Sequence, residues 1–102
     1  MIKVHINKNK IIMTGHAEYA SKNDIVCAAA SSIVITSINA CLKLDNSSLI
    51  YKEDYQNKEL SKLTIDITSD SKNILLIIEN MIEMLEELAF TYKKNIKIIK
   101  ED

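Results

Sequence analysis

The feature that most constrains the fold is a long stretch, residues 25–44, in which Lys43 is the only charged residue. Its first part, residues 25–30, is apolar on nearly every side of a helix, so we expect a helix from Ile25 to Leu44 that is buried on more than one face. Its β-branched run, Ile33-Val34-Ile35-Thr36, has modest helix propensity, and a buried strand there is the alternative. Such a helix exposes more apolar surface than a two-layer monomer covers, which favours a homodimer.

Apolar and polar residues alternate in several short segments, which is the pattern of half-buried strands. Lys62 to Thr68 shows it most clearly, with Leu63, Ile65 and Ile67 on one side. Residues 52–59 form a polar segment between two predicted strands, residues 18–24 are interpreted as a loop, and Asn7-Lys8-Asn9 is interpreted as the turn of a hairpin. The predicted strands are Ile2–Ile6, Lys10–Thr14, Leu49–Tyr51, Lys62–Thr68 and Ile96–Ile99.

A second helix is predicted over Lys72–Tyr92, capped by Ser69-Asp70-Ser71. It carries an apolar stripe at spacings of three and four residues, made of Ile74, Ile78, Met81, Leu85 and Leu88. The element order is therefore ββαββαβ. We expect an α+β fold with two layers, a mostly antiparallel sheet and two helices on one of its faces, formed by residues 1–102 as a single domain.

Charge and composition limit the partners that this chain is expected to have. The formal net charge is −1, and all 13 basic residues are Lys, so the bidentate Arg contacts that favour phosphate and base recognition are missing. We therefore expect no direct binding to nucleic acid. No apolar run is read as long enough to cross a bilayer, and the start of the sequence lacks the apolar region of a signal peptide. The expected location is the cytoplasm, without a membrane partner.

The two cysteines, Cys27 and Cys41, lie fourteen positions apart on the predicted helix. At 1.5 Å per residue this is about 21 Å, too far for a disulfide within one chain. Neither belongs to a CxxC pair, and the Glu row of the second helix lacks the His partners of a metal site. We expect two reduced thiols, no metal and no cofactor.

The chemistry-bearing residues gather around Gly15, His16 and Cys27. If Asn23 or Asp24 caps the helix, Cys27 lies in its first turn, where the helix dipole favours a thiolate. His16 could reach the sulfur across a short loop, which would bring together the two groups of nucleophilic cysteine catalysis. The start of the helix could also supply backbone donors to an oxyanion.

Each of these residues also has a structural interpretation. A cysteine in an apolar helix is often a small buried hydrophobe. Asp24 either caps the helix or orients the His16 ring, and Ser31, one turn after Cys27, either bonds a backbone carbonyl or lines the site. The single glycine, Gly15, indicates an unusual backbone conformation or a close approach of two chain segments.

Two motifs, Gly15-His16-Ala17 and residues 24–31 (Asp-Ile-Val-Cys-Ala-Ala-Ala-Ser), resemble the signature of the ribosomal-processing cysteine protease family Prp. The similarity continues through residues 37–40 and the order of elements. It implies a small dimeric endopeptidase that removes a short N-terminal extension from a large-subunit ribosomal protein precursor. The N-terminal peptide of that precursor is the implied partner, and a second copy of the chain is the other.

The same resemblance assigns roles to single residues. Cys27 is implied as the nucleophile and His16 as the general base and acid, while Asp24 and Ser31 match supporting positions. The loop between the two motifs matches a family loop that closes over substrate. That substrate loop comprises Ala17, Glu18, Tyr19, Ala20, Ser21, Lys22 and Asn23.

Two other functions compete with a protease. The first is a non-catalytic ribosome-assembly factor that binds the same protein tail and carries a cysteine by chance. The second is a thiol redox sensor, for which Cys27 would need a resolving thiol. Cys41 is too far along the helix to be that thiol within one subunit.

Overall fold

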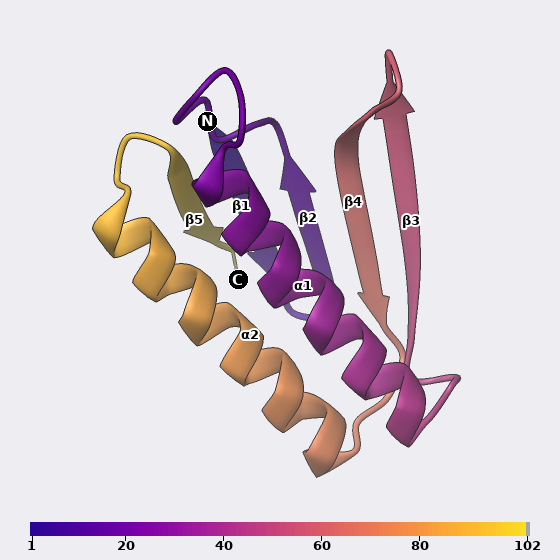
Figure 1. Ribbon diagram of the computed structural model, residues 1–102. Helices are drawn as coiled ribbons and strands as arrows, with labels where there is room; N and C mark the ends of the chain where they lie inside the picture. The colour runs from indigo at the N-terminus through magenta and orange to yellow at the C-terminus, as the bar shows by residue number, and fades with distance from the viewer. Residues whose placement is uncertain (102) are drawn as a thin grey trace.

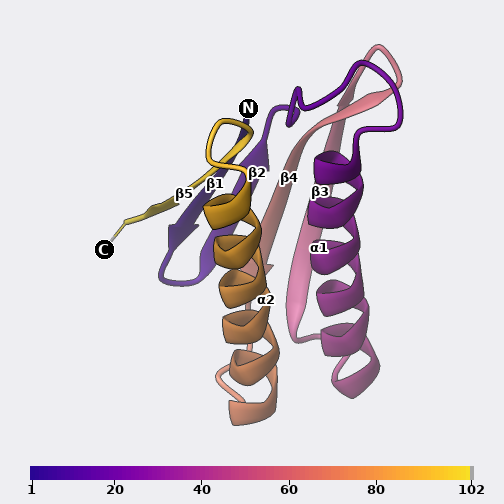
Figure 2. The ribbon, with the colours of Figure 1, turned by 60° about the vertical axis from the view of Figure 1, so that its left-hand side comes forward.

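The protein, described here over residues 1–101 by a computed structural model, places two helices against one face of a five-stranded sheet (Figures 1 and 2). The predicted element order ββαββαβ and the α+β class are confirmed. The elements are β1 (Ile2–Asn7), β2 (Lys10–Thr14), α1 (Ile25–Leu44), β3 (Leu49–Gln56), β4 (Glu59–Ile67), α2 (Lys72–Thr91) and β5 (Ile96–Lys100).

The strands follow the order β3-β4-β2-β1-β5 across the sheet. β3 pairs with β4, β4 with β2, and β2 with β1 in antiparallel fashion, whereas β5 joins β1 in parallel. The parallel pair requires a crossover, and α2 provides it. The sheet is therefore mixed and mostly antiparallel, as the sequence predicts.

The core lies between the helices and the sheet. Alternate strand residues face the helices, so that Val4 is 0% and Ile65 1% exposed, and they meet the predicted stripe of α2, in which Met81 and Leu85 are 0% exposed. α1 buries one stripe as well, made of Val26, Ala30, Val34, Ile38 and Cys41. This two-layer packing fixes α1, and with it the start of the helix, on the sheet.

The other side of α1 is less buried than the sequence predicts. Ile25, Ile35 and Leu44 are 54%, 55% and 58% exposed, because the sheet and α2 cover only part of the helix. α1 is also long and apolar enough to cross a membrane by length and composition alone, which corrects the expectation that no apolar run has that length. Here it packs as the core helix of the two-layer fold. The strand alternative for Ile33–Thr36 is wrong, because these residues are helical.

The hairpin of β3 and β4 is the main correction to the predicted elements. Residues 52–56 and 59–61, which lie outside the predicted strands, extend β3 and β4 to a two-residue turn. The turn residues Asn57 and Lys58 have φ of 52° and 66°, the positive values that a type I′ turn requires. β3 is an edge strand with most of its side chains exposed, so its polar residues cost little and resemble a loop in the sequence.

The predicted cap of α2 is only partly right. Ser71 stands at the N-cap position, yet its side chain makes no capping hydrogen bond. Instead, the Ser69 hydroxyl oxygen accepts the Ser71 N–H at 3.1 Å. The α2–β5 turn, the β2–α1 loop and the β3–β4 turn all lie at the end of the sheet where α1 begins (Figures 1 and 2).

Candidate active site

Asp24 begins the helix that carries Cys27. Its Oδ1 accepts hydrogen bonds from the N–H groups of Val26 at 3.0 Å and Cys27 at 3.1 Å. These groups would otherwise lack partners in the first turn of a helix. Cys27 is therefore the third residue of α1, close to the positive end of the helix dipole, as the sequence predicts.

The second carboxylate oxygen of Asp24 holds the preceding loop. Oδ2 accepts the N–H of Tyr19 at 3.0 Å and that of Ala20 at 3.3 Å. Desolvation raises the pKa of Asp24, but the four backbone hydrogen bonds outweigh it and hold this pKa below its ordinary value. Of the two alternatives for Asp24, the structure favours capping over orienting the His16 ring, because both oxygens bind backbone groups.

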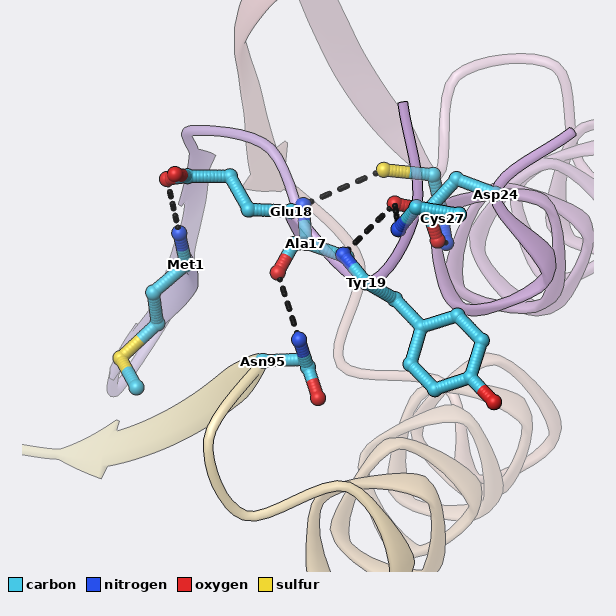
Figure 3. A network of polar contacts seen from close by, with 8 residues as sticks. Met1, Ala17, Glu18, Tyr19, Asp24, Cys27 and Asn95 are labelled. Carbon is cyan, nitrogen blue, oxygen red and sulfur yellow. Dashed lines mark hydrogen bonds and ion pairs between the residues drawn. The ribbon is translucent and has the colours of Figure 1, made fainter. Parts of the chain in front are cut away.

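The sulfur of Cys27 is half-buried and receives a hydrogen bond from the backbone. The Ala17 N–H donates to Cys27 Sγ at 3.2 Å. Ala17 itself is 0% exposed, and its carbonyl oxygen accepts a hydrogen bond from Asn95 Nδ2 at 3.0 Å. Figure 3 shows the Ala17 peptide between the sulfur and the Asn95 amide. The loop that follows His16 is thus attached directly to the cysteine.

A cavity of about 300 Å³ opens beside the sulfur. Three of the four residues singled out in the sequence, His16, Cys27 and Ser31, line it, whereas Asp24 lies behind it at the helix cap. The remaining walls come from β1, β2 with the Gly15 that follows it, and β4: Ile2, Met13, Gly15, Glu59, Leu60, Ser61, Lys62 and Leu63. The substrate-loop residues 17–23 are not among the lining residues.

The His16 imidazole stands at the open side of this cavity, half exposed. Its Nε2 lies 3.7 Å from Glu59 Oε2, on the first residue of β4. The hydrogen bond to the Cys27 sulfur comes from Ala17 rather than from this ring. Catalytic hydrogen bonds commonly tighten only when substrate is bound.

Both reasons for a glycine that the sequence suggested, an unusual backbone conformation and a close approach of two segments, apply at Gly15. Its φ is +83°, and a Cβ built on it would overlap the backbone carbonyl oxygen of Met1. Its N–H donates to the Ser61 carbonyl oxygen at 3.3 Å, which ties the end of β2 to β4. Gly15 thus fixes the direction in which the chain leaves the sheet and presents His16 to the cavity.

The start of α1 has fewer N–H groups to offer an oxyanion than the sequence predicts. The N–H groups of Val26 and Cys27, which the start of the helix could have offered to a substrate, are occupied by Asp24. Ser31 lines the cavity one turn after Cys27, in agreement with the second of its two interpretations.

The loop from Ala17 to Asn23 is held at several points. Glu18 and Asn23 adopt positive φ values of 58° and 51°. The Met1 ammonium lies 2.7 Å from Glu18 Oε1, and this contact is the main reason why the pKa of Glu18 is lowered. The Tyr19 ring meets the Tyr92 ring edge-on, with centroids 5.4 Å apart. In this structure the loop is ordered by contacts with three other segments.

Sequence reasoning missed the parts of the site that come from distant segments. Glu59 and Ser61 belong to the strand extension that resembled a loop, and Asn95 belongs to the turn between α2 and β5. No local motif marks any of them. Within residues 1–101, no three His, Cys, Asp or Glu side chains lie together as metal ligands would.

Comparison with known proteins adds a family to this geometry. The family model described as cysteine protease Prp matches residues 1–97. The ribosomal processing cysteine protease Prp of Staphylococcus aureus is 30% identical over 105 residues, which cover 96% of this chain and 97% of the relative.

Two crystal structures of Prp from S. aureus have the same fold. The complex with a covalently linked product peptide superposes with a TM-score of 0.86 at 28% identity, over 99% of this chain and 100% of that chain. The complex with a substrate peptide gives a TM-score of 0.80 at 27% identity, with the same coverage.

Proposed function

This chain belongs to the cysteine protease Prp family, and we propose that it hydrolyses a peptide bond with Cys27 as nucleophile and His16 as general base and acid. That the chain is a ribosomal processing cysteine protease rests on its relatives and on the peptide complexes of Prp. The assignment of the two residues rests on the site described above. Asp24 and Ser31 support them.

The observation that carries the assignment is the shared cavity. The sulfur of Cys27 and the imidazole of His16 line the same opening, at the start of α1. The helix dipole and the Ala17 N–H both favour negative charge on the sulfur. An imidazole that shares a cavity with such a sulfur can accept its proton and later return it.

The reaction has two halves. The Cys27 thiolate attacks the carbonyl carbon of the scissile peptide, His16 protonates the leaving amine, and a thioester forms between the enzyme and the acyl portion of the substrate. His16 then takes a proton from a water molecule, whose oxygen attacks the thioester. The carboxylic acid leaves, and Cys27 is restored as the thiol or thiolate.

The substrate follows from the relatives. We infer that it is the N-terminal peptide of a large-subunit ribosomal protein precursor, whose extension is removed. The S. aureus Prp is described with a substrate peptide and with a covalently linked product peptide, which supports a peptide partner. Closure of residues 17–23 over that peptide belongs to the same proposal.

The molecular setting of the reaction is also proposed. We infer a cytoplasmic homodimer formed by a single Prp-like domain, without a cofactor and without direct contact with nucleic acid or membrane. The half-exposed apolar side chains on the outer side of α1, among them Ile35, support a second copy as the covering surface.

Cleavage of the precursor is the direct test. The full-length ribosomal protein precursor of the same organism is incubated with the wild-type chain, with Cys27→Ala and with Cys27→Ser, and the products are identified by mass spectrometry. We expect one cut near the N-terminus with the wild type and none with either variant. Cys41→Ala serves as the matched thiol control and should retain cleavage when the protein is folded.

The same experiment separates the protease from the binding factor. A non-catalytic assembly factor would bind the precursor equally well with and without the Cys27 sulfur and would leave it uncut. Trapping of an acyl-enzyme at Cys27 by mass spectrometry would exclude that alternative. Binding without a covalent adduct or product would reject the proposed function.

A further inference from the structure

We propose that the Ala17 N–H is the group that holds Cys27 as a thiolate, and that Asn95 is the positioning residue that aims it. This inference rests on the proposed function, in which the thiolate attacks. It concerns two residues that come from different parts of the chain, the β2–α1 loop and the α2–β5 turn (Figure 3). Asn95 is not among the residues that line the cavity, and its side chain reaches the sulfur only through Ala17.

Both backbone polar groups of Ala17 are hydrogen-bonded. Its N–H points to Cys27 Sγ at 3.2 Å, and its carbonyl oxygen points to Asn95 Nδ2 at 3.0 Å. Ala17 is 0% exposed, so water does not compete for hydrogen bonds with its N–H and its carbonyl oxygen. The N–H belongs to the peptide group before the Ala17 Cα and the carbonyl to the one after it, so the Asn95 bond restrains the position of Ala17 and, through it, the N–H that faces the sulfur.

The direction of the N–H···S bond determines its chemical effect. A backbone N–H only donates, and a thiolate accepts a hydrogen bond far better than a neutral thiol does. The contact therefore stabilises the charged form of Cys27 selectively. The N–H groups of Val26 and Cys27 are occupied by Asp24, so the Ala17 N–H is a distinct contribution from a different segment.

Asn95 is held by the scaffold rather than by the loop. Its carbonyl oxygen accepts the N–H of Ile2 at 2.8 Å, at the start of β1, and its own N–H donates to the Tyr92 carbonyl oxygen at 2.9 Å. A central strand and the end of α2 thus fix the backbone of Asn95. Its side chain transmits that fixed position to Ala17, 78 positions away in the chain.

The amide is the suitable side chain for this position. Nδ2 carries the donor that the Ala17 carbonyl oxygen needs, and the short side chain leaves little freedom in where the donor points. An aspartate would place a second acceptor against that oxygen, and a leucine of similar shape would leave it unpaired. The contacts of Tyr19 and Ala20 with Asp24, and of the Tyr19 ring with Tyr92, are separate and should persist in either variant.

Alkylation of Cys27 measures the thiolate without any substrate. The rate of carbamidomethylation by iodoacetamide is measured at one pH, peptide by peptide, for the wild type, Asn95→Leu, Asn95→Ala and the neighbouring control Lys94→Ala. We expect Asn95→Leu and Asn95→Ala to slow Cys27 by about two- to fivefold, since a lost hydrogen bond reduces the thiolate fraction while the remaining thiolate becomes more nucleophilic. Lys94, exposed on the same turn, should change the rate by less than about 1.5-fold.

A second measurement observes the hydrogen bond itself. In the ¹H–¹⁵N spectrum of the wild type, the Ala17 amide proton should move upfield when Cys27 is alkylated, because the charge on the acceptor is removed. In Asn95→Leu that proton should already be displaced before alkylation. A merely structural role of Asn95 would lower the melting temperature without moving this signal.

Two results would overturn the inference. An unchanged or faster alkylation in folded Asn95→Leu would mean that the Ala17 contact does not favour the thiolate or that it shields the sulfur. If neither Asn95 variant folds, the wild type still provides the test. An Ala17 amide proton whose chemical shift does not change when Cys27 is alkylated would also overturn the inference.

Failure of this inference is distinguishable from failure of the protease assignment. Peptide cleavage should fall by the same factor as alkylation, through kcat and with little change in KM, because Asn95 does not line the cavity. Slower alkylation in a protein that never cleaves the precursor would reject the proposed function and keep the role of Asn95. Normal cleavage and unchanged alkylation in the Asn95 variants would reject the role of Asn95 and keep the proposed function.

Discussion

The carboxylate of Asp24 accepts the Cys27 N–H at 3.1 Å and thereby fixes the turn of helix from which the sulfur projects. The other oxygen of the same carboxylate accepts the Tyr19 N–H at 3.0 Å. One side chain thus links the start of α1 to the loop that contacts the sulfur. A substitution that keeps one of these oxygens and replaces the other should preserve the helix cap and release the loop.

Asp24→Asn should preserve the helix cap and release the loop, whereas Asp24→Ala should remove both the cap and the loop contacts. In Asp24→Asn one oxygen remains to cap the helix, but the NH₂ group would face the N–H groups of Tyr19 and Ala20 as a second donor. We expect Asp24→Ala to lower the melting temperature by roughly 4–8 °C and Asp24→Asn by less. Hydrogen exchange at the Tyr19 amide should accelerate in both variants. Retained protection in Asp24→Asn would contradict the assignment of Oδ2 to the loop.

The same carboxylate gives a pH dependence of definite sign. Its pKa is lower in the folded protein than its ordinary value, so the unfolded chain binds the proton more readily. The stabilisation by Asp24 is complete above the unfolded pKa of about 3.9 and is lost as the pH falls through the folded value. The difference in melting temperature between the wild type and Asp24→Ala should therefore shrink below about pH 4. If the difference in melting temperature stayed constant down to about pH 2–3, the stabilisation would not depend on ionised Asp24.

Local signals were sufficient to predict most of the fold. The apolar stripe of α2 and the alternation at Leu63, Ile65 and Ile67 predicted a two-layer structure, which is confirmed. The β3–β4 hairpin was missed, since its turn is Asn57-Lys58 without the glycine that normally marks a type I′ turn, and its edge strand is polar. A sequence pattern cannot distinguish a solvated edge strand from a loop.

The candidate site was predictable only where its residues are neighbours in the chain. His16, Cys27 and Ser31 lie within one short stretch, and the first turn of a helix with a capping Asp is a local feature. Glu59 and Asn95 reach the site through sheet pairing and through the crossover by α2, at separations that no motif encodes. Their roles depend on tertiary structure alone.

The hairpin turn offers a stabilising substitution. Lys58 has a φ of 66°, a conformation that strains a residue with a Cβ. Lys58→Gly should stabilise the protein by about 0.5–1 kcal/mol, because Asn-Gly is the preferred pair for a type I′ turn. Urea denaturation would measure this as a higher midpoint with an unchanged slope. Destabilisation would mean that the turn has a different conformation.

The opposite substitution applies to the single glycine. Gly15→Ala combines a positive φ of +83° with an overlap between the new Cβ and the Met1 carbonyl oxygen, and backbone atoms cannot move aside as a flexible side chain can. We expect a loss of about 2–4 kcal/mol in the free energy of unfolding. Ala20→Gly, in the exposed loop, is the matched control and should cost less than about 1 kcal/mol. A neutral Gly15→Ala would show that Gly15 and the Met1 carbonyl are not in close contact.

The two thiols should differ sharply in the native state. Cys41 is 0% exposed and burial raises its pKa, so it is both inaccessible and protonated. Cys27 is half-buried beside an open cavity. Brief alkylation under native conditions should label Cys27 at least tenfold faster than Cys41, and denaturation should abolish the difference. Equal native rates, read peptide by peptide, would contradict the placement of Cys41 in the core.

His16 Nε2 and Glu59 Oε2 lie 3.7 Å apart, and we expect the two residues to differ greatly in their importance for cleavage. Both side chains are half or more exposed, and such pairs contribute about 0–1 kcal/mol, so Glu59→Gln should change kcat/KM by less than about fivefold. His16→Ala removes the proposed base and acid and should reduce cleavage by at least a hundredfold. His16→Gln is the matched polar control, because it keeps hydrogen bonding at the cavity mouth but cannot shuttle a proton. If Glu59→Gln proved as damaging as His16→Ala, Glu59 would have to act on the imidazole during the reaction, and the site would function as a triad rather than a dyad.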